Sequence, residues 1–123
     1  MPVSASVIGF IPANDFRRAK KFYADKLGLR FVSKDTFALV FKSGGTTIRV
    51  VKVPDFKPAG YTILGWRVAD VPRRVTALGK RGIVFERYPW MQQDALGIWT
   101  APGGARIAWF KDPDGNVLSL SSR

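Results

Sequence analysis

Apolar residues recur along the chain at two spacings, and these spacings predict strands and helices in a repeated order. The apolar, β-branched segment 3–11 predicts a first strand, which Pro12 is expected to end. Segment 15–28 has apolar residues at three- and four-residue steps, which predicts an amphipathic helix with Asp15 as its N-cap and Gly28 at its end. Three more strands are expected at residues 29–33, 37–41 and 47–53.

The second half of the chain repeats this order after a connector at residues 54–60. A strand at 62–68 precedes Asp70, a second helix N-cap, and this helix has Pro72 in its first turn and ends near Gly82. Strands are then expected at residues 84–87, 98–100, 105–110 and 117–120, with an insertion at 89–97. The matching order indicates a duplication. We therefore expect an α+β fold of two tandem βαβββ modules, residues 1–54 and 61–123.

Composition narrows the possible chemistry. The chain has 123 residues, enough for one domain, and a hydrophobic fraction of 46% that can form a core. It has neither a membrane-length apolar run nor a signal-peptide pattern, so we expect a soluble, cytoplasmic protein without membrane partners. Cysteine and histidine are both absent, which excludes disulfides, Ser-His-Asp triads and imidazole metal ligands. No catalytic residue can be assigned from the sequence.

The formal net charge of +11 makes nucleic acid, a membrane surface and an anionic ligand each worth considering. The basic residues are scattered, and no basic run is longer than Arg17-Arg18 or Lys20-Lys21. No RNA-binding aromatic motif is present either. The pattern therefore favours a solvated basic surface over a nucleic-acid interface.

Two segments carry a resemblance to a known family. Residues 22–29, FYADKLGL, resemble the FYxxxLGL helix end of the vicinal oxygen chelate superfamily, and residues 110–120, FKDPDGNVLSL, resemble its FxDPDGNxxEL ending. That superfamily comprises glyoxalases, dioxygenases, bleomycin-resistance proteins and relatives. The resemblance implies two βαβββ modules whose curved mixed sheets enclose a cleft. It also implies a divalent metal bound by histidine on each module's first strand and glutamate on its last.

The positions implied for these metal ligands hold other residues. Ile8 and Ile63 stand where the resemblance places histidines, while Arg49 and Ser119 stand where it places glutamates. None of these four side chains is a usual ligand of a divalent metal. We therefore expect no metal and no cofactor.

The resemblance implies that the metal-ligand positions point into the cleft, and strand alternation extends this inward side to residues two positions away. It places Phe10 on the first strand, Arg49 on the fourth, Arg67 on the fifth and Ser119 on the last. Two guanidinium groups above apolar residues suit a carboxylate or phosphate on a hydrophobic body. The alternative is that one or both arginines reach solvent at the strand ends, because burying unpaired cations is costly.

The insertion at residues 89–97 and its flanks are rich in large side chains, which could cover a bound aromatic ligand. Trp90 and Trp99 could stack on a planar ligand beside Met91. A satellite core or a dimer interface is the alternative, since aromatic residues and methionine also mark association surfaces.

These observations favour a metal-independent protein that binds or sequesters an anionic or aromatic small molecule. The alternative is a lyase-like enzyme, similar to lactoylglutathione lyase, or a dioxygenase-like enzyme, in either case without the usual metal site. A nucleic-acid-associated basic protein is the least favoured function. We also expect a homodimer, although two modules in one chain could satisfy each other.

Overall fold

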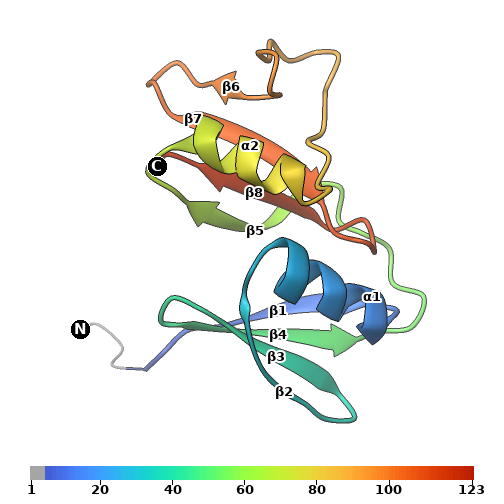
Figure 1. Cartoon of the computed structure of the whole chain (residues 1–123). Coiled ribbons are helices and arrows are strands. Elements are labelled where there is room, and N and C mark those ends of the chain that lie inside the picture. Colours follow the sequence, from blue (N-terminus) through green and yellow to red (C-terminus); the bar gives the residue numbers. More distant parts are fainter. Residues whose placement is uncertain (1–4) are drawn as a thin grey trace. The chain divides into compact units, whose positions relative to one another are not determined.

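One helical segment covers one face of each of two four-stranded sheets in the computed structural model, which describes residues 5–123 (Figure 1). The sheets belong to two compact units, Met1–Lys57 and Pro58–Arg123. Both sheets are mixed, which confirms the expected α+β class and fits two tandem modules. No helix among the described residues is long and apolar enough to cross a membrane.

The first unit follows the predicted βαβββ order, and its sheet has the strand order β1-β4-β3-β2. β1 pairs with β4 in parallel, and the remaining pairs are antiparallel. Alternate residues such as Ile11, Leu39 and Val50 are almost completely buried on the face beneath the helical segment. The elements are β1 (Ile8–Ala13), α1 (Phe16–Lys20), the π-helix η1 (Lys21–Lys26), β2 (Arg30–Lys34), β3 (Ala38–Ser43) and β4 (Thr46–Lys52).

The start of this unit differs from the prediction in two ways. β1 begins at Ile8 and continues through Pro12 to Ala13 instead of ending before Pro12. Proline is tolerated because β1 is an edge strand, where a missing backbone donor need not interrupt a ladder. Residues 3 and 4 of the expected strand lie outside the described residues.

The predicted first helix changes its winding halfway. After α1 the chain widens into η1, where the Leu27 amide donates to the Phe22 carbonyl at 2.9 Å. The wider turn allows the adjacent Phe22 and Tyr23 to be buried together, with ring centroids 5.1 Å apart. Gly28 follows with φ of 79°, a left-handed conformation that suits glycine at a helix end.

The second unit has the strand order β5-β8-β7-β6, again with its first and last strands parallel. Asp70 caps α2 as predicted, because its carboxylate accepts a 3.1 Å hydrogen bond from the Arg73 amide. The buried residues of α2 are Val71, Val75 and Leu78. The elements are β5 (Thr62–Arg67), α2 (Val71–Lys80), β6 (Trp99–Thr100), β7 (Arg106–Lys111) and β8 (Val117–Ser121).

The strand predicted at residues 84–87 is wrong. Only one isolated bridge forms there, between Phe85 and Phe110. β6 pairs with the other end of β7, through Trp99 and Ile107. The insertion therefore replaces the middle of the strand that would pair with β7. Only the Phe85 bridge at one end of β7 and β6 at the other end remain paired with it.

The DPDGN segment forms the turn between β7 and β8. The side chain of Asp112, which is only 5% exposed, accepts hydrogen bonds from the amides of Asp114 and Asn116 and from the Asn116 side chain. Gly115 has φ of 87°, and a Cβ there would lie 3.0 Å from the Pro58 ring. Both constraints favour glycine at this position.

Replacing Asp112 by alanine should destabilise the protein by about 2–4 kcal/mol, because it leaves buried donors unsatisfied. Urea unfolding followed by far-ultraviolet circular dichroism measures the change. The exposed Asp25 provides a matched control, and Asp25→Ala should change stability by no more than about 0.5 kcal/mol. Equal stabilities of the two variants would contradict this account of the turn.

Candidate functional site

Because successive side chains of a strand alternate, the second sheet has two different faces. We call the buried face the sealed face and the more exposed face the open face. On β8, Leu118 and Leu120 are at most 2% exposed, whereas Ser119 and Ser121 are half-buried on the opposite side. Strand pairing carries this division across the sheet. The open face consists of Thr62, Gly65, Arg67, Trp99, Ile107, Trp109, Lys111, Val117, Ser119 and Ser121.

The charged and aromatic side chains of this open face lie in two rows that run across the strands. One row runs from Arg67 through Ser121 and Ile107 to Trp99. The second row runs from Gly65 through Ser119 to Trp109. Because adjacent strands lie about 4.8 Å apart, Arg67 and Trp109 come from strands separated by roughly 10 Å. A cation and an aromatic surface thus lie on one face, with small residues between them.

An aromatic cluster forms where the insertion meets β7, and it consists of Tyr88, Trp90, Trp99 and Trp109. The Trp109 ring centroid lies 5.9 Å from that of Tyr88 and 6.2 Å from that of Trp99. Trp90 is 77% exposed and extends the cluster, with its centroid 5.0 Å from that of Tyr88. The Trp109 indole donates a 3.1 Å hydrogen bond to the Thr62 hydroxyl, which holds its orientation.

The insertion is fixed by the side chain of Gln93. Its carbonyl oxygen accepts a 2.8 Å hydrogen bond from the Tyr88 amide. Its amide nitrogen donates to the backbone carbonyls of Glu86 at 3.0 Å and Gly97 at 2.8 Å. One half-buried side chain thus ties together the two ends of the insertion.

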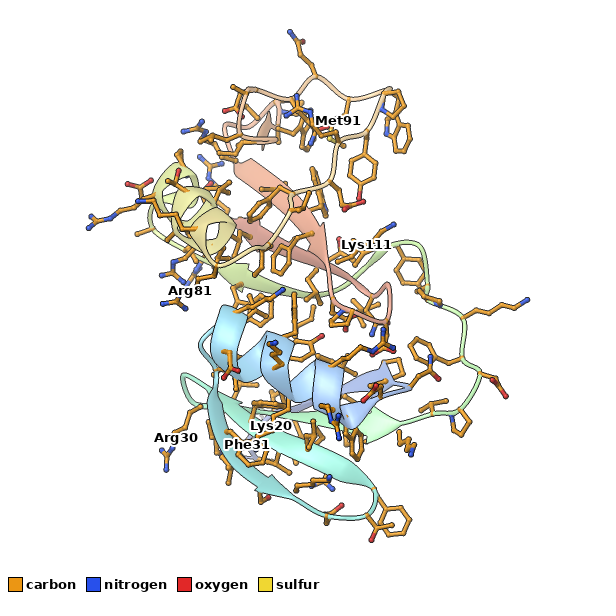
Figure 2. The ribbon with its side chains drawn as sticks, turned by 45° about the vertical axis from the view of Figure 1, so that its right-hand side comes forward. Lys20, Arg30, Phe31, Arg81, Met91 and Lys111 are labelled. Carbon is orange, nitrogen blue, oxygen red and sulfur yellow. The ribbon has the colours of Figure 1, made fainter. Side chains whose placement is uncertain are left out.

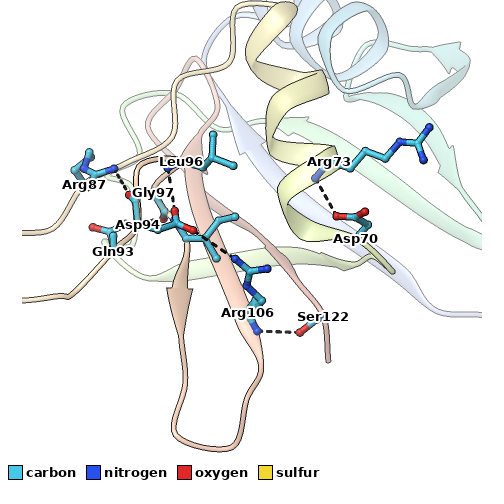
Figure 3. Close-up of polar contacts among 10 residues, drawn as sticks. Asp70, Arg73, Arg87, Gln93, Asp94, Leu96, Gly97, Arg106 and Ser122 are labelled. Atoms are coloured by element: carbon cyan, nitrogen blue, oxygen red, sulfur yellow. Dashed lines mark hydrogen bonds and ion pairs between the residues drawn. The ribbon is translucent and has the colours of Figure 1, made fainter.

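Asp94 adds a second set of links (Figure 3). Its carboxylate accepts hydrogen bonds of 2.9 Å from the amides of Leu96 and Ile98 and lies 3.4 Å from the Arg106 guanidinium. The Arg87 side chain donates to the Asp94 carbonyl at 2.8 Å. Many short links restrict a loop's alternatives, so the aromatic cluster is held in a preformed arrangement.

Glu86 is the single glutamate of the chain and lies beside Trp109. The Glu86 amide donates to the Trp109 carbonyl at 2.7 Å. Its carboxylate is 3.6 Å from the ammonium group of Lys111, which is labelled on β7 in Figure 2. Burial raises the pKa of the Tyr88 hydroxyl, and the negative charge of Glu86 raises this pKa further.

In the first unit, the predicted residues Phe10 and Arg49 are direct neighbours on the open side of their sheet. Phe10 is 62% exposed, and Ile8 on the same side is 49% exposed. Arg49 already has a partner, because its guanidinium lies 3.9 Å from the Asp35 carboxylate. Elsewhere in this unit, Lys20 covers the Phe31 ring at 4.1 Å from its centroid (Figure 2).

Hydrogen bonds from the Phe37 and Ala38 amides lower the pKa of the Asp35 carboxyl group, and the charge of Arg49 lowers it further. Asp35 thus performs two tasks at once. It closes the turn before β3 and offsets part of the positive charge of Arg49.

The positions implied for metal ligands do not fit a divalent cation. Ile63 is left unpaired where the register of β5 and β8 shifts, and a Cβ on Gly65 would lie 2.5 Å from the Ser119 hydroxyl oxygen. Ile8 and Arg49 supply neither a neutral nor an anionic donor. Within residues 5–123 no three carboxylates gather in a way that could hold a metal ion.

The structure groups the predicted site residues by unit. Arg67, Ser119 and Trp99 share the open face of the second sheet, with Trp90 next to it. Phe10 and Arg49 belong to the first sheet. Sequence analysis missed Trp109, Tyr88 and Glu86 as parts of this constellation. The sequence could have identified Trp109, because the DPDGN turn sets the register of a hairpin in which Trp109 pairs with Ser119.

Comparisons with known proteins agree with this fold. The model of the Glyoxalase/Bleomycin resistance protein/Dioxygenase superfamily matches residues 6–120. The uncharacterized protein YraH of Bacillus subtilis (strain 168) is 25% identical over an aligned length of 122, and the alignment covers 87% of this chain and 89% of YraH.

Two solved structures are also similar. TnmS3, an antibiotic binding protein from Streptomyces sp. CB03234, has a TM-score of 0.69 and 26% identity, covering 98% of this chain and 96% of its own. A lactoylglutathione lyase from Agrobacterium tumefaciens has a TM-score of 0.75 and 20% identity, covering 98% and 95%. At that identity, the lyase supports the fold alone.

Gln93→Ala should loosen the insertion, because it removes one acceptor and two donors from the backbone groups of its ends. We expect faster amide hydrogen exchange at Tyr88 and a loss of about 1–3 kcal/mol in unfolding free energy. The exposed neighbour Gln92 provides the control, and Gln92→Ala should leave exchange at Tyr88 unchanged. Unchanged exchange in the Gln93 variant would show that the insertion is held in another way.

Asp35 should contribute to acid sensitivity. Because its folded-state pKa lies below the ordinary value of 3.8, ionised Asp35 stabilises the fold above that pH, and the contribution is lost as pH falls through the lowered pKa. Asp35→Asn should therefore lose less stability than the wild type between about pH 5 and about pH 2. Urea unfolding at several pH values measures this slope, and an equally steep loss in the variant would contradict the prediction.

Proposed function

The chain belongs to the Glyoxalase/Bleomycin resistance protein/Dioxygenase superfamily, and on this premise we propose that it is a metal-independent binder of anionic aromatic small molecules. The ligand lies on the open face of the second sheet. Its aromatic part stacks on Trp99, Trp109 and the adjoining insertion, and its anionic group pairs with Arg67. The aromatic cluster is the observation that carries this proposal.

The available donor side chains support independence from a metal. The chain has no histidine and no cysteine, and two isoleucines, one arginine and one serine occupy the implied ligand positions. Divalent transition metals need imidazole, thiolate or carboxylate donors in close proximity. In this proposal, binding uses stacking, hydrogen bonds and side-chain charge in place of a metal.

The aromatic cluster is suited to a planar ligand. Three tryptophans and one tyrosine gather at one edge of the sheet, and Trp90 is largely exposed to solvent. Stacking between aromatic rings contributes about 0.5–1.5 kcal/mol beyond the apolar area that it buries. The links from Gln93 and Asp94 add affinity because the ligand need not order the insertion.

Charge favours an anionic group on that ligand. Arg67 is exposed on the open face, and its side chain makes no hydrogen bond or ion pair with another residue between positions 5 and 123. The overall charge of +11 attracts anions at long range and repels cations. A planar guanidinium also matches a carboxylate in geometry. Arg49 is a weaker candidate, because Asp35 already offsets part of its charge.

One relative supports binding rather than catalysis. TnmS3 is described as an antibiotic binding protein, and it is 26% identical to this chain along nearly its whole length. This likeness supports a role in binding a small molecule. A lyase-like or dioxygenase-like activity is the alternative, and the experiment below distinguishes it by examining the ligand after binding.

Isothermal titration calorimetry with 2-naphthoate and with neutral 2-naphthamide tests the proposal. We expect 2-naphthoate to bind more tightly and to bind equally well after treatment with a chelator. Arg67→Ala should weaken the carboxylate by about 1.5–3 kcal/mol, as for a hydrogen bond to a charged group, and should leave the amide unaffected. Trp99→Ala should weaken both compounds.

Arg74→Ala is the matched control, because it removes the same charge from an exposed position on α2. It should leave the affinity for 2-naphthoate nearly unchanged. Absence of binding to either compound at millimolar concentration would overturn the proposal. Recovery of chemically altered naphthoate after incubation would instead establish turnover and favour the enzyme alternative.

A further inference from the structure

We propose that Glu86 is a second recognition residue of the open face, which selects aromatic anions bearing a hydrogen-bond donor at the end opposite their anionic group. The proposal rests on the proposed function and specifies its ligand more closely. The ligand would then be an aromatic acid with a hydroxyl or amino group at its far end.

Strand register places Glu86 on the ligand side of the sheet. Phe85 pairs with Phe110 on the sealed side, and their ring centroids are 5.3 Å apart. Because successive side chains alternate, Glu86 points to the opposite side. Its contact with Lys111 agrees, since Lys111 pairs with Val117 on the open face.

Glu86 and Arg67 occupy opposite edges of this face. Arg67 lies on β5, the outer strand of the sheet, while Glu86 extends the row of Gly65, Ser119 and Trp109 beyond β7. Three strand spacings, about 14 Å, separate the two positions across the sheet, and two residues, about 7 Å, separate them along the strands, so their backbones lie about 16 Å apart. Side chains of these lengths shorten the distance between the charged groups. The face thus has a cationic edge, an aromatic centre and an anionic edge.

The Glu86 carboxylate retains the capacity to accept another hydrogen bond. Its side chain is 29% exposed, and Lys111 contacts one of its two oxygens at 3.6 Å. A carboxylate offers about four lone-pair positions, so acceptor sites remain for a ligand. Lys111 also keeps Glu86 from repelling an anionic ligand strongly, since it offsets part of the charge. A donor on the ligand would meet an ionised acceptor, which makes the stronger kind of hydrogen bond.

The neighbours Trp109 and Gln93 make this acceptor select for ligands that carry a hydrogen-bond donor at this edge. Glu86 adjoins Trp109 through a 2.7 Å backbone hydrogen bond, and its own carbonyl is held by Gln93. The backbone of Glu86 is therefore fixed at the end of the aromatic cluster, and this places the start of its side chain there. A ligand that stacks on Trp109 without a donor at this edge would displace water from the Glu86 carboxylate and leave that carboxylate without a replacement hydrogen bond. Such a ligand would bind less tightly.

Three naphthoates provide the test by calorimetry: 6-hydroxy-2-naphthoate, 6-methoxy-2-naphthoate and unsubstituted 2-naphthoate. The hydroxyl and carboxylate lie at opposite ends of the ring. We expect the hydroxy compound to bind the wild-type protein about tenfold more tightly than the other two, the lower range for a hydrogen bond to a charged group. Glu86→Gln, which preserves the shape of the side chain, should reduce this preference severalfold, and Glu86→Leu should abolish it.

Two further variants separate the role of Glu86 from that of its neighbours. Lys111→Met should retain the preference for the hydroxy compound, because the carboxylate remains. Arg67→Ala should weaken all three naphthoates and leave their ranking unchanged. Circular dichroism establishes that each variant is folded.

The outcomes distinguish this inference from the proposed function. If the three naphthoates bind the wild type with equal affinity, Glu86 has no selective role, while the aromatic binding face stands. A preference that survives in Glu86→Leu also overturns the inference. If none of the three binds, the proposed function fails and the role of Glu86 fails with it.

Discussion

The parallel pairing of the first and last strands in each unit is the constraint on which the other features depend. In the second unit this pairing sets Leu118 and Leu120 on the sealed face and turns Ser119 and Ser121 to the open face. A shift of one residue would bury the serines and expose the leucines. The energy of the apolar core therefore fixes which polar and aromatic side chains are available to a ligand.

The insertion departs from this regular strand pairing, and side-chain hydrogen bonds take the place of the missing hydrogen bonds between strands. Where β2 in the first unit pairs continuously apart from one bulge, the equivalent edge of the second sheet holds the single bridge of Phe85 at one end and the two-residue strand β6 at the other. Side-chain links from Gln93 and Asp94 satisfy the backbone groups that a strand would otherwise pair. The second unit thereby exchanges part of a ladder for a rigid aromatic surface.

Local patterns predicted most of the fold and part of the site. Both N-caps and the repeated element order follow from short-range spacing. The shared side of Arg67 and Ser119 follows from strand alternation once the resemblance has supplied the metal-ligand positions. The failures involve tertiary context: Pro12 is accommodated because β1 is an edge strand, and the strand at 84–87 is interrupted by the insertion. The pairing of Arg49 with Asp35 and the contact of Glu86 with Lys111 depend on folded geometry that residue spacing alone does not give.

The four positions that correspond to metal ligands in the resemblance also differ from such a site in charge. Two carboxylates and two imidazoles would make such a site anionic before a cation binds. Here one carboxylate position holds Arg49 and the other holds Ser119, so the same positions have become cationic and neutral. In the first unit, Asp35 offsets part of the positive charge that Arg49 brings to its position. In the second unit, Ser119 is uncharged and pairs with Gly65 on the strand that also carries Arg67, so this position adds no carboxylate that would repel the anionic ligand we propose.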